Sequence, residues 1–198
     1  MHNCIFTPHC TESVCDNSCP ILVETSYLLE RNGISMKSPV FNSSPEYIER
    51  AVSLLNKSSG QLSIATCQDT VSTAELFTYC AICLNWQGSR LHCNVYNLKY
   101  STYLEDLKRS WTTKSEPESL QYTKIWASSA KVLIISNIDY VNFGDFESQT
   151  LLNLLQSREN TGQTTIIVSP NIHKLIYKHS SLFFTPLKTK LEKAVREW

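Results

Sequence analysis

The residues best suited to chemistry are cysteines, and they fall into two groups. The chain of 198 residues contains eight of them, and four crowd the first twenty positions at the spacing C-x5-C-x4-C-x3-C: Cys4, Cys10, Cys15 and Cys19. Four thiolates this close together suit the tetrahedral coordination of zinc, and metal binding can fold a segment too short to have its own core. We therefore predict a metal site in this segment, with zinc as the first choice of metal.

Three alternatives to this zinc site stay open. His2 or His9 could replace Cys4 as the fourth ligand. Cys19 precedes Pro20, as in ferredoxin-type cluster sequences, so an iron–sulfur cluster is the second choice of cofactor. The third alternative is a set of free thiols in a mobile arm. The remaining cysteines lie in apolar sequence and are expected in the core, where free cysteine is common: Cys67, Cys80, Cys83 and Cys93.

The composition indicates a folded protein without a general affinity for polyanions. Eighteen Lys and Arg balance eighteen Asp and Glu, and hydrophobic residues make up 42% of the chain. A net charge of zero argues against general electrostatic binding of nucleic acid or anionic membranes, although a local patch could still bind. No secretory signal is visible, and no apolar run approaches the roughly 20 residues that span a bilayer. We expect a soluble, cytoplasmic protein, in which metal ligation is favoured over disulfides.

Hydrophobic periodicity divides the chain into helices and strands. Helices are expected at 20–33 and at 45–55, separated by a linker at 34–44 that contains Pro39 and several serines. Beyond Gly60 the predicted elements alternate, with strands at 62–65, 92–98, 131–138 and 164–168 and helices at 73–86, 103–111, 120–129 and 146–159. Strands that are apolar on both faces and separated by helices indicate an α/β fold, with a mostly parallel sheet covered by helices on each side.

The predicted organisation has three parts. Residues 1–33 form a cysteine-rich metal-binding module with a helix, residues 34–44 form the linker, and residues 45–198 form the α/β domain. The linker would let the metal module move relative to the domain.

The layout of residues 60–175 resembles the ATPase domain of bacterial helicase loaders of the DnaC/DnaI type, which are AAA+ P-loop ATPases. Four stretches carry the resemblance: Gly60 to Ala65, His92 to Trp111, Lys131 to Asp139, and Leu151 to Asn171. A small cysteine-rich zinc domain at the N-terminus is also similar to the arrangement in DnaI. The resemblance implies a P-loop NTPase sheet, a replicative helicase as partner, and a role in DNA replication, with a phage or mobile element as the expected source.

The phosphate-binding loop of that family is degenerate in this chain. The five glycines lie too far apart to form G-x-x-x-x-G-K-[ST], and the Walker A position is the run from Thr66 to Thr73, TCQDTVST. Thr66 and Val71 replace the two glycines, and Ser72 replaces the lysine that would reach the phosphates. Thr73 alone keeps a magnesium-binding hydroxyl. The resemblance therefore leaves Thr66, Ser72 and Thr73 as the candidate, weak nucleotide contacts.

The acidic Walker B pair is also missing. Its positions fall at Ser136 and Asn137, and Asp139, two residues further on, is expected to be misplaced; the sensor position holds Pro170 or Asn171. Phosphoryl transfer depends on positioning and charge neutralisation, and these residues offer little of either. We therefore predict a pseudo-ATPase with no catalytic residues, which does not hydrolyse ATP and binds it weakly or not at all.

The leading interpretation is a helicase-loader-like accessory protein of DNA replication that acts by protein–protein contact, through the metal module and the helix that follows it. One alternative is an α/β enzyme with an iron–sulfur cluster. The other is a metal-stabilised regulatory module that binds single-stranded nucleic acid, in which aromatic residues would stack on bases. The candidates for stacking are Tyr96, Tyr100, Tyr103 and Trp111, although such residues more often fill the interface between a sheet and its helices.

Overall fold

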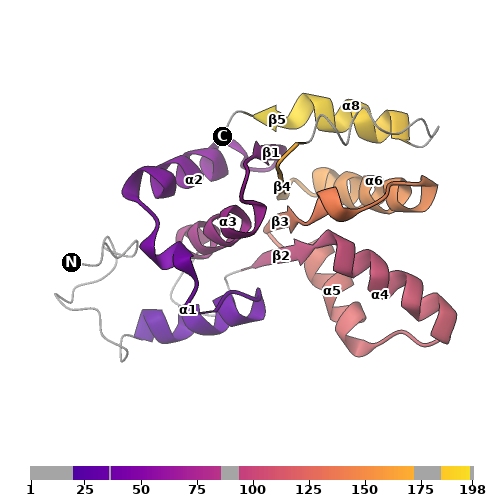
Figure 1. Ribbon diagram of the computed structural model, residues 1–198, viewed down its shortest axis with the longest axis horizontal. Coiled ribbons are helices and arrows are strands. Elements are labelled where there is room, and N and C mark those ends of the chain that lie inside the picture. Colours follow the sequence, from indigo (N-terminus) through magenta and orange to yellow (C-terminus); the bar gives the residue numbers. More distant parts are fainter. Residues whose placement is uncertain (1–19, 36, 86–93, 172–183, 197–198) are drawn as a thin grey trace.

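The sheet is the centre of the molecule. The computed structural model describes residues 20–35, 37–85, 94–171 and 184–196. Five parallel strands lie in the order β2-β3-β4-β1-β5 (Figure 1). They are β1 (Leu62–Thr66), β2 (Val95–Lys99), β3 (Val132–Ser136), β4 (Thr164–Ser169) and β5 (Val195–Arg196). The predicted parallel α/β sheet is confirmed, and the two-residue strand β5, which the sequence analysis missed, extends it beyond β1.

Helices cover both faces of this sheet (Figure 1). On one face lie α1 (Pro20–Arg31), the 3-10 turn η1 (Pro39–Asn42), α2 (Pro45–Lys57) and α3 (Thr70–Asn85). On the other lie α4 (Tyr100–Thr113), α5 (Glu118–Ser129), α6 (Asp145–Asn160) and α8 (Phe184–Ala194), and the short turn η3 (Ile138–Tyr140) follows β3. Within the described ranges, no helix has both the length and the apolar character to cross a membrane.

The strands are apolar because both of their faces are buried. Every residue of β3 and β4 is buried. Successive side chains point to opposite faces, so Ile134 joins the core beneath α3 while Leu133 and Ile135 join the core beneath α4 to α8. This two-sided burial explains the unbroken apolar runs from which the sheet was predicted.

The segment 34–44, interpreted above as a linker, contributes to the hydrophobic core. Ile34 and Val40 are 1% and 2% exposed and belong to the same cluster as Leu28 and Leu29 of α1. Gly33 has a φ of +74° and closes α1, with the Ile34 N–H bonded to the Leu29 carbonyl at 2.9 Å, which is the pattern of a Schellman cap. Leu28 and Leu29 of α1, the helix proposed above as a partner contact, therefore lie inside the chain's own core, which was the alternative interpretation of this helix.

A buried arginine, Arg158, forms hydrogen bonds that join α5, α6 and the start of β4. Arg158 of α6 is 0% exposed, and its guanidinium donates to the carbonyl oxygens of Ala127, Ala130 and Thr164 at 3.0, 2.8 and 2.6 Å. It also donates to the Thr165 hydroxyl at 2.8 Å. Burial lowers the pKa of Arg158 to about 10, which keeps it charged at neutral pH. Arg158 thereby ties α5 and α6 to β4.

Candidate functional site

A crevice is expected where β1 and β4 end side by side. The two strands pair from Leu62 with Thr165 to Thr66 with Ser169, so they finish together. The chain then leaves β1 toward α3 on one face, and the helix after β4 in the described chain, α8, lies on the other face. Open α/β sheets bind ligands at such a divergence, outside the carboxyl ends of the strands. The residues that end these strands are therefore the candidate site, which we call the β1–β4 crevice.

The three predicted nucleotide contacts all lie at this crevice. Thr66 is the last residue of β1, and Ser72 and Thr73 lie in the first turn of α3; all three are half-buried. The backbone after β1 is tied down, because the Cys67 N–H donates to the Ser169 carbonyl at 3.1 Å. The structure therefore brings the predicted residues together without supplying a lysine or a glycine-rich loop.

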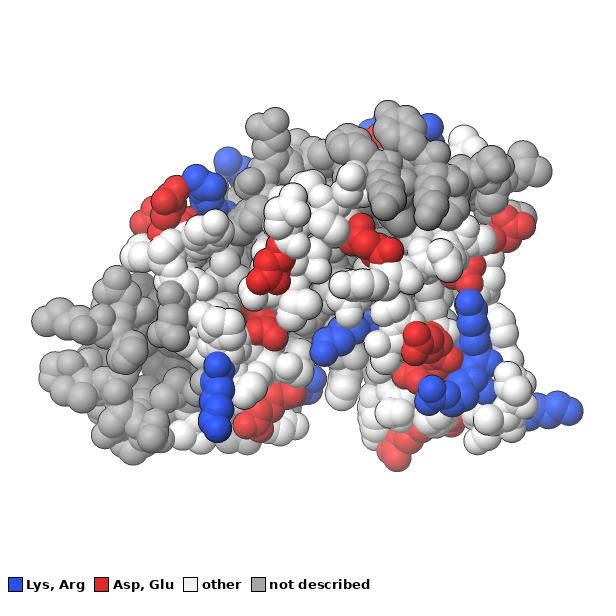
Figure 2. Space-filling view, viewed as in Figure 1, with Lys and Arg blue, Asp and Glu red and all other residues white. Residues whose placement is uncertain are grey.

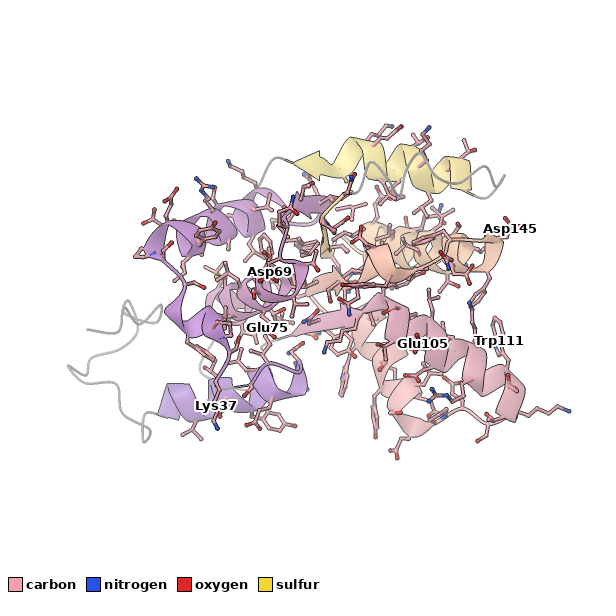
Figure 3. The ribbon with its side chains drawn as sticks, viewed as in Figure 1. Lys37, Asp69, Glu75, Glu105, Trp111 and Asp145 are labelled. Atoms are coloured by element: carbon pink, nitrogen blue, oxygen red, sulfur yellow. The ribbon has the colours of Figure 1, made fainter. Side chains whose placement is uncertain are left out.

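The residue that the sequence analysis missed in this crevice is Asp69 (Figure 3). Its Oδ1 accepts the Ser72 N–H at 2.9 Å, and its backbone carbonyl accepts the Thr73 N–H at 3.2 Å, so Asp69 is the N-cap of α3. The hydrogen bonds from Ser72 lower the pKa of the Asp69 carboxyl below its usual range. A helix N-terminus is where a P-loop binds phosphate, and here it is bonded to the chain's own carboxylate. The signal was present in the sequence, since aspartate is a preferred N-cap residue.

Asp139, which we expected to be misplaced for a Walker B role, lies beside the end of β4. Asn137 has a φ of +59°, and this left-handed turn directs the chain into η3 immediately after β3. The Asp139 Oδ1 accepts the hydroxyl of Ser169, at the end of β4, at 2.7 Å. Ser136, at the Walker B position, is buried, and its hydroxyl donates to Asn97 Oδ1 at 3.2 Å.

The electrostatics of the crevice are those of a site that disfavours anions. The residues after β1, β3 and β4 in the ranges 66–73, 136–139 and 169–171 include Asp69 and Asp139 but no lysine or arginine. Burial and these two carboxylates raise the pKa of the Cys67 thiol, against a hydrogen bond to Thr73 that lowers it. Cys67 is therefore a neutral thiol at neutral pH, which makes it a poor nucleophile and a poor metal ligand.

The predicted metal ligands Cys4, Cys10, Cys15 and Cys19, with the alternatives His2 and His9, lie outside the described residues. Within the described part of the chain, no group of three or more His, Cys, Asp or Glu side chains could hold a metal ion. Of the apolar cysteines, Cys80 is buried in the core as predicted, and burial raises the pKa of its thiol to about 12.

The four aromatic residues suggested for base stacking have different environments. Tyr100 is 0% exposed, stacks on Phe143 and donates its hydroxyl to the Glu147 carbonyl at 2.8 Å, so it fills the interface between the sheet and its helices, as the sequence favoured for such residues. Tyr96 and Tyr103 are half-buried, whereas Trp111 is exposed and packs edge-on against Phe146 near the start of α6 (Figure 3). Two aromatic residues of α5 were missed, Tyr122 and Trp126, and these stack on one another.

No protein-family model matches the chain, and no curated protein matches it in sequence. Among solved structures, the replication initiator DnaA bound to AMPPCP and single-stranded DNA is similar, with a TM-score of 0.58 and 9% sequence identity. The match covers 82% of this chain and 50% of that chain, so this chain spans about half of the length of the initiator. The likeness shows the fold: an α/β domain whose parallel sheet is covered by helices on both faces.

Proposed function

We propose that this protein is a non-hydrolysing AAA+-like protein of DNA replication, which acts in the cytoplasm by binding other macromolecules. The observation that supports the loss of catalysis is the hydrogen bond from the Ser72 N–H to the Asp69 carboxylate. In a P-loop this part of the helix would bind a phosphate, and a side-chain carboxylate bonded there competes with that phosphate for the same donors. The fold shared with a replication initiator supports the process in which the protein acts.

The surrounding charges support the same proposal. A triphosphate in the β1–β4 crevice would meet the Asp69 and Asp139 carboxylates, and the ranges 66–73, 136–139 and 169–171 contain no lysine or arginine to neutralise its charge. The Asp139 carboxylate is already engaged by the Ser169 hydroxyl. We infer that the fold is kept for its surfaces.

Nucleotide binding and turnover test this proposal directly. Titration with a fluorescent ATP analogue in the presence of Mg²⁺ should give no saturable signal, and phosphate release should not exceed that of buffer. The Asp69→Ala variant should also fail to bind, because the lysine and glycines are still absent. Turnover that disappears in Thr73→Ala, but persists in Thr112→Ala on the exposed side of α4, would contradict the proposal.

The partner that we propose is a replicative helicase, with the protein in the role of a loader-like accessory. Since Leu28 and Leu29 are buried, the part of α1 open to a partner is the side that carries Val23 and Tyr27, which are 46% and 52% exposed. A pull-down from the native host should recover the helicase, and Tyr27→Ala should weaken its recovery. Tyr47→Ala on α2, at 53% exposure, is the matched control and should leave recovery unchanged. Equal recovery with both variants would remove α1 as the contact.

We also propose that the N-terminal cysteine cluster binds zinc, on the basis of its spacing. Elemental analysis of protein purified without chelator should find about one zinc per chain. Cys15→Ser should reduce this metal content while the sheet domain stays folded. Protein that contains neither zinc nor iron would contradict the assignment.

A further inference from the structure

The outer edge of strand β2 forms hydrogen bonds with residues at the end of α1 over part of its length. β2 is the outermost strand on its side of the sheet. The side-chain amide of Asn32 donates to the Val95 carbonyl at 3.4 Å and accepts the Asn97 N–H at 2.7 Å, as the peptide group of a neighbouring strand would. Arg31 also donates to the Val95 carbonyl, at 3.1 Å. This part of the edge therefore cannot accept a peptide as an added strand.

Beside this contact lies a groove of about 230 Å³, bounded by the end of α1, by β2 and by the helices that follow it. Its lining includes Arg31, Tyr96, Lys99, Tyr103, Asp106 and Thr123. Figure 2 shows the surface hollowed between the lobe that contains α1 and the lobe that contains α4 and α5. The volume is below the roughly 300–1,000 Å³ of pockets that enclose a small molecule. A ligand here would therefore lie partly in the groove and partly on the surface beside it.

The charge of the groove favours an anion. In the described part of the chain, neither Arg31 nor Lys99 forms an ion pair, and the buried Nε of Arg31 has no hydrogen-bond partner. The carboxylate in the lining, Asp106, is paired with Arg109 at 3.5 Å. Arg31, which keeps its hydrogen bond to the Val95 carbonyl, and Lys99 thus line the groove without an anionic partner in the described part of the chain, and such a pair of cations complements a phosphate.

Aromatic rings continue from the groove onto the exposed face of α5. The Arg31 guanidinium lies 5.7 Å from the ring centre of Trp126, and Tyr96 lies 5.5 Å from the same ring. Tyr122 stacks on Trp126 with 5.6 Å between ring centres and an angle of 21°, and Tyr122 is 46% exposed. An exposed ring held by stacking offers a preformed surface to another flat ring.

We propose that this surface, the β2-edge groove together with Tyr122 and Trp126, binds single-stranded DNA. Phosphates lie at Arg31 and Lys99, and bases stack on Tyr96 and Tyr122. A duplex does not fit this role because its bases already stack on one another. The choice of DNA rests on the replication function proposed above; the phosphate and base contacts rest on the groove itself.

Two acidic residues at and just before the start of α5 disfavour phosphates there. Glu118, in the first turn, accepts the Tyr122 hydroxyl at 2.8 Å, and Glu116, two residues before the helix, pairs with Lys124 at 2.6 Å. In this arrangement the phosphates pass on the side of Arg31 and Lys99, and bases reach Tyr122.

Fluorescence anisotropy of a labelled oligo-dT of about 12 nucleotides, titrated with the full-length protein at several salt concentrations, tests the proposal. Binding should weaken as salt rises, and Lys99→Ala should lower the salt slope by about 0.7, the value of one phosphate contact on a single strand. Tyr122→Ala should weaken binding at least about 5-fold, because stacking contributes about 1–3 kcal/mol per base. Tyr122→Phe keeps the ring and should bind like the native chain.

Matched variants on α2 provide the controls. Tyr47→Ala and Lys57→Ala remove an exposed ring and an exposed cation far from the groove, and both should leave binding unchanged. Absence of binding at low salt, equal binding by groove and control variants, or stronger binding of a duplex, of oligo-rU or of an acidic peptide would overturn the proposal. ATP turnover would instead contradict the proposed function without affecting the proposal that the groove binds DNA. The failure of one proposal can therefore be distinguished from the failure of the other.

Discussion

The β1–β4 crevice and the β2-edge groove differ in how their polar groups are used. In the crevice, Asp69 is bonded to the start of α3 and Asp139 to Ser169, so the chain satisfies these groups itself. In the groove, the described chain leaves Lys99 and the Nε of Arg31 without an anionic partner or hydrogen bond. The difference teaches that the fold by itself does not indicate where a ligand would bind. Polar side-chain groups that lack a partner on rigid helices and strands are the better guide to a binding site.

The largest expected effect comes from Arg158, which ties α5, a wall of the groove, to the start of β4. Arg158→Met should lower the free energy of unfolding by about 3–5 kcal/mol, because the carbonyls of Ala127, Ala130 and Thr164 lose their buried donor. Urea unfolding measures this loss. Arg109→Met removes an exposed arginine of α4 and should change stability by less than about 1 kcal/mol. Similar losses in both variants would show that the buried hydrogen bonds of Arg158 do not hold α5 to β4.

The next largest effect on stability is expected from the burial of α1, the helix that forms one wall of the groove. Leu28→Ala should cost about 2–5 kcal/mol, because Leu28 is 0% exposed in a core shared with α3. Val23→Ala, on the exposed side of the same helix, should stay within about 0.5 kcal/mol. Thermal or urea unfolding followed by circular dichroism compares them. If Leu28→Ala left stability unchanged, α1 would be independent of the sheet and the groove would lose one of its walls.

A smaller effect is expected at the edge of β2. Asn32→Ala should lower stability by about 1–3 kcal/mol, since the Asn97 N–H loses its partner, although Arg31 still donates to the Val95 carbonyl. It should also promote association between chains, because an open strand edge pairs with other strands. Urea unfolding and light scattering measure the two effects. Asn56→Ala, exposed on α2, is the control and should change neither; a monomeric, fully stable Asn32→Ala would show that the edge needs no cover.

The smallest expected effect on stability is at Asp69, in the β1–β4 crevice. Asp69→Ala should cost about 0.5–2 kcal/mol at neutral pH, as expected for the loss of an N-cap. The folded-state pKa of Asp69 lies below its ordinary value, so this contribution is present above the unfolded-state pKa of about 3.9 and is lost as the pH falls through the folded-state pKa. The difference between native and variant chains should therefore shrink in acid.

Unfolding curves at neutral and acidic pH test this dependence. Asp145→Asn, in the exposed first turn of α6 (Figure 3), is the control for loss of an acidic residue near a helix start and should have the smaller effect. A constant cost of Asp69→Ala across the acidic range would contradict the capping role of the carboxylate.

The sheet could be predicted from sequence because its signals are local. β3 and β4 contain apolar runs, and β1 and β2 are short segments of mixed apolar and polar residues. Each lies next to a helix pattern, and such patterns depend on neighbours within a few residues. β5 was missed because two residues carry no pattern. The serines and Pro39 of segment 34–44 indicated a linker. The segment packs on the domain instead, because Ile34 and Val40 bury apolar surface in the core.

The candidate sites were predictable only in part. The sequence contained the degenerate Walker positions and a preferred N-cap residue, so the loss of the phosphate loop could be predicted from Thr66, Val71 and Ser72. The β2-edge groove could not be predicted, because it depends on contacts between distant positions: Asn32 and Asn97 are 65 residues apart. No local pattern places Arg31 against Trp126.

The order of the chain gives the Asn32 contact a consequence during synthesis. Asn32 precedes the β2 edge that it covers by about sixty residues. At roughly 5–20 residues per second, α1 leaves the ribosome roughly 3–13 s before β2 does. The residues of the cover are therefore already outside the ribosome when the strand appears. The nascent edge emerges on a chain that already carries its own cap, which shortens the time in which the edge of a neighbouring nascent chain could pair with it.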